Sequence, residues 1–265
     1  MRARGSARRV VVQVLDEALD GHVGDTRDHI EVVRHALPQG IRIVELQGLI
    51  TAKTVPSVRS ALEDADPGRF PAGAIVLIDS PGGDGLAAIE IGRMVRAASA
   101  HVFVRGRCAS ACTYVLAGGV VRGVARDGAI GIHGPRLTTF VKGIGTVDVN
   151  AASNPRAAAA LELGNRRSRE YFSDMGLPDA LFSEMLATPS GGIRYLDLAE
   201  LPALGLAGFD PAYLAGRAPA AARVYRISGE EYARRTLTVP GLCLAVKGTA
   251  DEFLRCYRRA LRTGE

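Results

Sequence analysis

Strand-like and helix-like segments alternate between residues 41 and 135, and this alternation constrains the fold more than any other feature. The segment AGAIVLIDS (72–80) is a short continuous apolar run, which is typical of a strand buried on both faces of a parallel sheet. A helical pattern follows at 85–99, and another strand pattern at 101–106. Parallel strands need a crossover connection, usually a helix, so this order predicts βαβ units and an α/β fold.

The remaining segments are assigned in the same way. We expect a short helix at 25–37, a strand at 41–48, a helix at 51–65 interrupted by Pro56, a short helix at 110–119, two short strands within 120–135, a loop or ribbon at 134–155, and the longest helix at 155–176. A Pro/Ala-rich linker at 217–223 precedes a tail that is expected to form a strand and a basic helix. These assignments divide the chain into an N-terminal extension (1–40), a main domain (41–215) and a C-terminal α/β extension (216–265).

Composition and charge exclude some classes of protein. The chain has 265 residues, of which 47% are hydrophobic, so it can bury a substantial core. Its formal net charge is +5, but only three of the 33 basic residues are lysines, there is no tryptophan, and the basic residues do not interleave with aromatic ones. We therefore expect no nucleic-acid partner.

The N-terminus and the cysteines bear on the cellular compartment. The Arg-rich start is followed by only a short apolar run, Val10 to Leu15, which is too short for a signal peptide, and no segment reaches membrane-spanning length. We expect a cytoplasmic protein from the chain as written, and an envelope or periplasmic protein if the N-terminus is incomplete. The four cysteines form no CxxC pair, and we interpret them as buried thiols rather than disulfides or metal ligands.

Three short motifs follow one another along the main domain. The first is DSPGGDG (79–85), where a strand end is followed by two glycines and a helix; the second is CASAC (108–112), with Ser110 at a helix start; the third is IGIHGP (130–135), with His133 at a strand end. Each alone has an ordinary structural explanation, as a tight turn, a helix N-cap or a structural histidine. Their combination meets a chemical need.

A serine nucleophile needs a base within hydrogen-bond reach and N–H donors directed at the developing oxyanion. The helix start offers Ser110 the neighbouring amide of Ala111 and a dipole that favours negative charge. A second amide would come from the glycine turn, where no side chain blocks the approach. His133 would be the base, because its strand is expected near the strand that precedes Ser110.

At these residues the stretch 41–135 resembles the proteolytic subunit of the Clp protease, within the wider crotonase-like superfamily. That family has a strand ending in SPGG, a helix, a strand, a nucleophilic serine among small residues, and a histidine in IHxP; the gap of 23 residues between Ser110 and His133 is close to the family's. The segment 196–207 resembles the family's closing helix, and the cysteines beside the serine resemble bacterial Clp-like proteins of the cell envelope. The resemblance implies a crotonase-like core, with Ser110 and His133 as catalytic residues and the amides of Gly83 and Ala111 as the oxyanion hole.

One departure from the family concerns the third catalytic residue. The family has an aspartate shortly before the closing helix, whereas the segment TPSGGIRY (188–195) contains no acid, and we interpret Asp197 as part of a capping box with Glu200. Ser190 or a backbone carbonyl would then orient His133. Relatives of signal peptide peptidase on this fold use a serine–lysine dyad, so Lys142 is an alternative base, although a solvated loop lysine is the simpler interpretation.

These observations predict a serine endopeptidase-like hydrolase that cleaves peptides or unfolded protein through an acyl-enzyme. The alternatives are a catalytically weak or inactive Clp-like scaffold that binds peptides or partner subunits, and a crotonase-type acyl-CoA enzyme. We expect no cofactor and no metal; a separate ATPase or a membrane protein is a possible partner. The 155–176 helix lies where the family has its oligomerising segment, and an exposed face with Leu161, Tyr171 and Phe172 would be costly on a monomer, so we expect a homo-oligomer with this helix as its interface.

Overall fold

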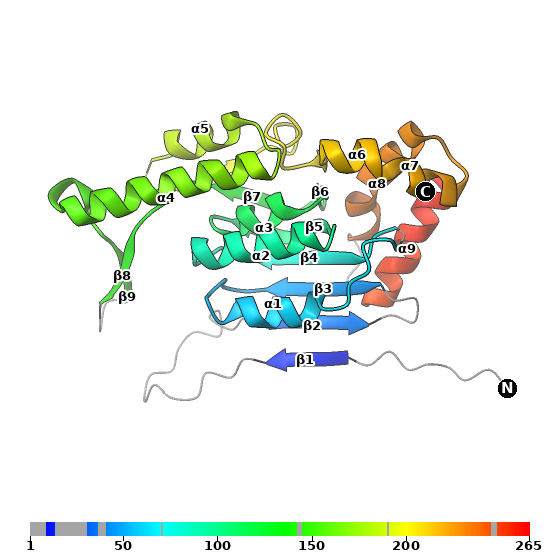
Figure 1. The fold of residues 1–265 in the computed structure, drawn as a ribbon, viewed down its shortest axis with the longest axis horizontal. Helices are drawn as coiled ribbons and strands as arrows, with labels where there is room; N and C mark the ends of the chain where they lie inside the picture. Colours follow the sequence, from blue (N-terminus) through cyan, green and yellow to red (C-terminus); the bar gives the residue numbers. More distant parts are fainter. Residues whose placement is uncertain are drawn as a thin grey trace.

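A mixed β-sheet lies at the centre of the protein and carries helices on both faces (Figure 1). The computed structural model describes residues 9–13, 31–36, 41–69, 71–141, 145–189, 191–244 and 248–265, and the structural statements below concern these residues. Among them, nine strands form one sheet in the order β1-β2-β3-β4-β5-β6-β11, from which β7 and β10 branch beside β5. The α/β class predicted from the alternating segments is therefore confirmed.

The parallel part of the sheet is formed by the strands that the sequence predicts most clearly. The strands of the sheet are β1 (Arg9–Gln13), β2 (Glu31–Ala36), β3 (Arg42–Gln47), β4 (Ala74–Ser80), β5 (His101–Ala109), β6 (Val121–Val124), β7 (Ala129–Ile132), β10 (Arg194–Leu196) and β11 (Gly208–Phe209). β3, β4 and β5 are parallel neighbours, while β5 pairs with β6 through its first half and with β7 through its second half. β1 and β2 extend the sheet with antiparallel pairing. A separate hairpin is formed by β8 (Thr138–Val141) and β9 (Gly145–Asp148).

The helices are arranged in two groups (Figure 1). The first group is α1 (Thr54–Leu62), α2 (Gly85–Ala97), α3 (Cys112–Gly118), α4 (Pro155–Asp174) and α5 (Asp179–Ala187). The second group is α6 (Pro211–Gly216), α7 (Ala218–Tyr225), α8 (Gly229–Cys243) and α9 (Ala250–Thr263). A single 3-10 turn, Ala151–Ser153, precedes α4.

Two hydrophobic clusters lie on opposite faces of the sheet because successive strand residues point to opposite sides. Val76 and Ile78 of β4 belong to the cluster covered by the first group of helices. Ile75 and Leu77 belong to the cluster covered by α6 to α9. A strand buried in this way on both faces is apolar throughout, and this explains the continuous apolar run at 72–80.

A buried histidine connects the start of β5 to the second group of helices. His101 is fully buried, and its Nδ1 and Nε2 lie 2.7 Å and 3.1 Å from the hydroxyl oxygens of Tyr257 and Tyr213. Burial lowers the pKa of His101 from its usual 6.5 to about 3. The histidine is therefore neutral at pH 7, as a buried ring bonded to two neutral hydroxyl groups requires.

Several elements differ from the sequence predictions. Residues 31–36 are expected in a helix but form β2, because antiparallel pairing with β3 buries Val32 and Val33. Pro56 lies in the first turn of α1, where proline is tolerated, and does not interrupt the helix. The segment 196–207, expected as a closing helix, instead begins with the last residue of β10 and continues as turns and bends, in which Pro202 has no N–H to continue a helix.

The C-terminal region also differs. The segment expected as a linker, 217–223, belongs mostly to α7, in which Ala218, Ala221 and Ala222 are buried. The strand expected at the start of the tail is the end of α8, which a disulfide between Cys243 and Cys256 joins to α9. The helices of the extension 216–265 therefore pack on the sheet rather than apart from it.

The long helix α4 has nearly the predicted length, but it does not expose the predicted aromatic side chains. Pro155 lies at its first turn, and Gly176 follows it with a positive φ of 72°. Tyr171 and Phe172 are 0% and 2% exposed and pack in the core beside Tyr114, so they are not available to a second copy of the chain. That part of the argument for an oligomer interface is wrong.

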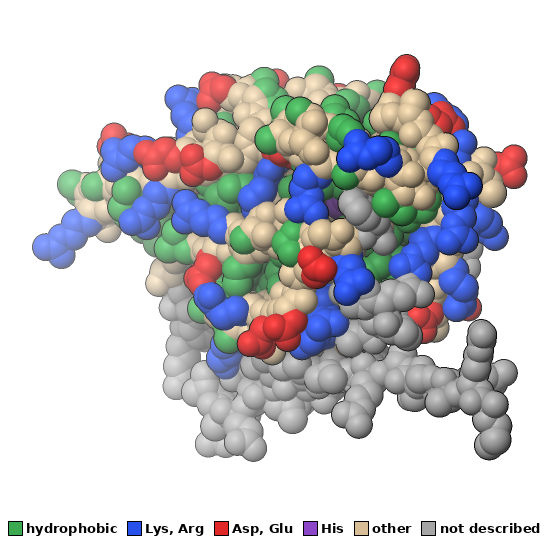
Figure 2. Space-filling view, turned by 45° about the vertical axis from the view of Figure 1, so that its right-hand side comes forward, with side chains coloured by type: hydrophobic (Ala, Val, Ile, Leu, Met, Phe, Trp, Pro, Cys, Tyr) green, Lys and Arg blue, Asp and Glu red, His purple; other side chains and the backbone are tan. Residues whose placement is uncertain are grey.

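Charged side chains of both signs lie on the face of the protein shown in Figure 2. In the face shown by Figure 2, Lys and Arg side chains are interspersed with Asp and Glu, with apolar side chains between them. Among the described residues, no helix combines the length and the apolar character needed to cross a bilayer.

Candidate active site

Ser110 lies in a tight turn between β5 and α3. Its φ of +56° is in the left-handed region, which a residue with a Cβ adopts only when its surroundings hold it there. The Ser110 N–H donates to the Gly131 carbonyl at 2.8 Å, and the Ser110 carbonyl accepts from the N–H and the hydroxyl of Thr113. These bonds thus hold both peptide groups of Ser110.

His133 follows the end of β7, the strand that pairs with the last residues of β5. Its Nε2 lies 2.7 Å from Ser110 Oγ. Its Nδ1 lies 2.6 Å from the carbonyl oxygen of Gly134, and a carbonyl only accepts, so Nδ1 carries the proton. Nε2 is then the basic nitrogen and can accept the Ser110 hydroxyl proton. The structure therefore brings these two predicted residues together in the orientation that a serine–histidine pair requires.

The glycine turn at 81–83 packs directly against Ser110. Gly82 has φ +103°, and a β-carbon there would lie 2.5 Å from the Ala109 carbonyl oxygen and 2.7 Å from Ser110 Cβ. The turn is held by the buried Ser80 hydroxyl, which donates to the Gly48 carbonyl and accepts from the Gly82 N–H. At position 82, only glycine fits so close to the serine. At Gly83 the constraint is different, because a β-carbon there would lie 2.1 Å from the Ile50 carbonyl oxygen.

Two backbone N–H groups beside Ser110 have no acceptor among the described residues. They belong to Gly83 and Ala111, whose neighbours Asp84 and Ser110 donate to the Ile50 and Gly131 carbonyls instead. Gly83 is exposed and Ala111 is 4% exposed. Unpaired backbone donors next to a nucleophile are the groups that can bind an oxyanion.

Arg136 approaches the same histidine and was not anticipated from the sequence. Its Nη2 lies 3.3 Å from His133 Nε2, and its Nη1 forms an ion pair of 3.7 Å with Asp148 of β9. Asp148, the last residue of the hairpin, thus pairs with the cation that lies beside His133. The position of Arg136 three residues after His133 was the only available signal, and an arginine in an Arg-rich chain is not distinctive.

Burial and charge together keep His133 neutral. Burial lowers the pKa of His133 below its usual 6.5, the bond to the Gly134 carbonyl acts in the opposite direction, and the Arg136 guanidinium lowers it further. A neutral imidazole is the form that can act as a general base at pH 7.

The two cysteines that flank Ser110 are joined to each other. Cys108 of β5 and Cys112 of α3 form a disulfide with a Cα–Cα distance of 5.2 Å, and Cys243 pairs with Cys256. The expectation of free buried thiols is therefore wrong. A spacing of four suggests one helix, whereas the strand-to-helix turn at Ser110 folds Cys108 back toward Cys112.

The other candidate residues do not enter this geometry. Ser190 and Lys142 lie outside the described residues, so their predicted roles stay predictions. Glu200 accepts from the Asp197 N–H at 2.8 Å, as in a capping box, but the Glu200 N–H donates to the Asp197 carbonyl rather than to its side chain, and the segment that follows forms turns instead of a helix. Within the described part of the chain, no group of three or more His, Cys, Asp or Glu side chains is arranged to hold a metal ion.

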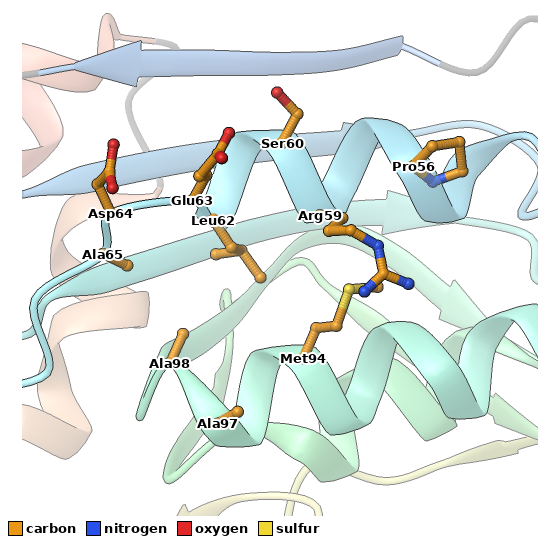
Figure 3. A pocket seen from close by; sticks show the side chains of 10 residues that line it. All are labelled: Pro56, Arg59, Ser60, Leu62, Glu63, Asp64, Ala65, Met94, Ala97 and Ala98. Atoms are coloured by element: carbon orange, nitrogen blue, oxygen red, sulfur yellow. The ribbon is translucent and has the colours of Figure 1, made fainter.

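A surface hollow of about 470 Å³ lies between the C-terminal ends of α1 and α2 (Figure 3). Its lining includes Leu62, Asp64, Met94 and Ala98, and it contains none of the residues around Ser110. We assign no ligand to it.

Comparisons with known proteins add little to this geometry. No protein-family model matches the chain, and no curated protein matches it. Among solved structures, a mutant of a membrane-bound stomatin-specific protease is similar at 17% identity and a TM-score of 0.44, over 62% of this chain and 76% of that one. A similarity at this level does not identify an activity.

Proposed function

We propose that the protein is a serine peptidase that cleaves peptides or unfolded protein through an acyl-enzyme. The observation that carries the proposal is the 2.7 Å contact between Ser110 Oγ and His133 Nε2, beside two backbone N–H groups without an acceptor among the described residues. This is the minimal set of groups that acyl transfer by a serine needs.

In the proposed reaction, Ser110 Oγ attacks the peptide carbonyl carbon while His133 Nε2 takes the hydroxyl proton. The amides of Gly83 and Ala111 bind the oxyanion of the tetrahedral intermediate. His133 then gives its proton to the leaving amine as the C–N bond breaks, and a water molecule, activated by the same nitrogen, hydrolyses the acyl-enzyme.

The Gly134 carbonyl occupies the place that an aspartate takes in a triad. It accepts the Nδ1 proton and so fixes the tautomer, but it carries no full negative charge to stabilise the imidazolium. Replacing a triad aspartate can reduce turnover by roughly 10⁴-fold, so we propose a slow enzyme. The absence of a carboxylate beside His133 Nδ1 also favours the second candidate, a scaffold that binds peptides without cleaving them.

The disulfides support an oxidising compartment. Both pairs of cysteines in the described residues are bonded, and such bonds persist in secreted and envelope proteins but rarely in the cytosol. We therefore favour the cell envelope over the cytoplasm as the location.

The test is proteolysis of an unfolded protein substrate, with the products identified by mass spectrometry. We expect slow cleavage by the wild-type protein and none by the Ser110→Ala and His133→Gln variants. Binding of the substrate without cleavage by the wild type, and unchanged binding by Ser110→Ala, would favour the scaffold instead.

A further inference from the structure

The Cys108–Cys112 disulfide encloses Ser110 as the middle residue of its short loop. Cys108 is the penultimate residue of β5, Cys112 is the first residue of α3, and both are fully buried. We propose that this disulfide is a positioning element for the nucleophile, so that the redox state of these two sulfurs sets the reactivity of Ser110. This inference rests on the proposed function of Ser110.

The strained backbone conformation of Ser110 explains why the turn needs a covalent constraint. A residue with a Cβ is less stable in the left-handed region than in the ordinary regions, so the turn tends to relax if its ends are free to move. Relaxation of φ would rotate the Ser110 side chain away from His133. Because Ser110 is held within the loop by a bond to Gly131 and by Thr113, a covalent link across the loop removes the remaining freedom.

The disulfide also constrains the position of one of the two N–H donors, that of Ala111. Ala111 lies between Ser110 and Cys112, and a β-carbon on Gly82 would be only 2.9 Å from its nitrogen. Any movement of the loop would therefore displace the Ala111 N–H as well as the nucleophile. A displacement of about 1 Å at reacting groups can reduce a rate by roughly 100-fold.

The second disulfide provides a matched control. Cys243 and Cys256 join α8 to α9 and pack in the cluster on the opposite face of the sheet. Removing that bond takes away a covalent constraint of the same chemical type without touching the loop of Ser110.

A small dithiol changes the redox state of the two sulfurs by thiol–disulfide exchange. Because both cysteines are fully buried, the attack takes place when the turn opens locally. One thiolate of the dithiol then attacks a cysteine sulfur and breaks the S–S bond, giving a mixed disulfide and releasing the other cysteine as a thiolate. The second thiol of the reagent then displaces the remaining cysteine, so that the protein gains two thiols and the dithiol becomes a cyclic disulfide.

The primary experiment measures the rate at which a fluorophosphonate probe labels Ser110. We expect the Cys108→Ala/Cys112→Ala variant to be labelled about 10- to 100-fold more slowly than the wild type, and the Cys243→Ala/Cys256→Ala variant to stay within about twofold. In the latter variant, dithiothreitol should then slow the labelling, and reoxidation should restore it. Equal rates for all three proteins, or equal losses in both variants, would overturn the proposal.

A second measurement separates this proposal from the proposed function. The imidazole ¹⁵N resonances of His133 report its hydrogen bond to Ser110 whether or not the protein turns over a substrate. We expect that bond to be lost in Cys108→Ala/Cys112→Ala, or after dithiol treatment of Cys243→Ala/Cys256→Ala should the first variant not fold. If the wild type is never labelled but the bond still depends on the disulfide, the peptidase function fails while the positioning role stands; a bond that persists overturns the positioning role.

Discussion

At the scale of single residues, the neutrality of His133 is the property on which acid–base chemistry depends. Burial and the nearby Arg136 guanidinium both lower its pKa, so the imidazole should stay unprotonated and basic below pH 6.5. The acidic limb of a pH–rate profile reports this ionisation, because the protonated ring cannot accept the Ser110 proton. We expect the limb of kcat/KM to lie below pH 6.5.

Replacing Arg136 should move that limb in a known direction. The Arg136→Gln variant removes a cation that opposes protonation of His133, and it leaves Asp148, which favours protonation, without its ion-pair partner. The pKa of His133 should therefore rise, and the acidic limb should shift to higher pH. Arg59→Gln is the control, since Arg59 pairs with Glu90 on the surface of α1 and α2. A limb that stays in place or moves to lower pH in Arg136→Gln would show that the arginine does not act on His133.

A methyl group at Gly82 should disturb the site without altering any polar side chain. The φ of +103° and the close approach to Ala109 and Ser110 leave no room for a β-carbon. We expect Gly82→Ala to lower the free energy of unfolding by about 1–3 kcal/mol, as overpacking does, and to slow labelling of Ser110. Urea unfolding measures the first effect, and the fluorophosphonate rate measures the second.

The matched substitution for this test is Gly164→Ala in α4. A β-carbon there meets nothing within 4 Å, and alanine favours the helical conformation. It should therefore raise the unfolding free energy by about 0.5–1 kcal/mol and leave the labelling rate unchanged. Similar outcomes for the two alanines would argue against a special role for the glycine turn.

At the scale of elements, small residues determine how α2, α3 and α4 meet. A β-carbon on Gly92 of α2 would lie 1.9 Å from the Tyr171 hydroxyl and 2.6 Å from the Tyr114 carbonyl oxygen, to which that hydroxyl donates. We expect Gly92→Ala to destabilise the protein by about 1–3 kcal/mol in a urea titration. Adding Tyr171→Phe should recover only part of the loss, since the Tyr114 carbonyl still blocks the methyl group. Full recovery, or no loss at all, would contradict this packing.

The elements also show what could be predicted from the sequence. The parallel strands carry apolar runs and α2 carries a helical period, and the motifs at their ends predicted Ser110 and His133 within reach of each other. Residues 31–36 were misassigned because two valines fit either a helix or a strand, and only pairing with β3 decides between them. The contact of Arg136 with His133 and the Cys108–Cys112 bond arise from the positions of a hairpin and a turn, which no local pattern encodes.

At the scale of the whole molecule, His101 should make stability depend on pH. Its pKa is about 3 in the folded protein and near 6.5 in the unfolded chain, so the unfolded chain binds protons first as the pH falls. The unfolding free energy should decrease below pH 6.5 by up to about 1.4 kcal/mol per pH unit and level off near pH 3. Urea titrations between pH 7 and pH 4 should show a shallower decline for His101→Gln. Identical slopes for the two proteins would show that His101 is not the group responsible.

Assembly remains a prediction at this scale. With Tyr171 and Phe172 in the core and Leu161 half-buried, the large apolar residue that α4 exposes is Leu163, which is 37% exposed and gives little area for a subunit interface. Light scattering at micromolar concentration measures the mass directly: a multimer would support the homo-oligomer implied by the family resemblance, and a monomer would remove it.

The central claim is that Ser110 is a nucleophile activated by His133. The most direct measurement is the site and stoichiometry of fluorophosphonate modification, determined by mass spectrometry of the intact protein and of its peptides. We predict one adduct per chain on Ser110, formed much more slowly in His133→Gln and absent in Ser110→Ala. An unmodified wild-type protein, an adduct on another residue, or a rate unaffected by His133→Gln would contradict the claim.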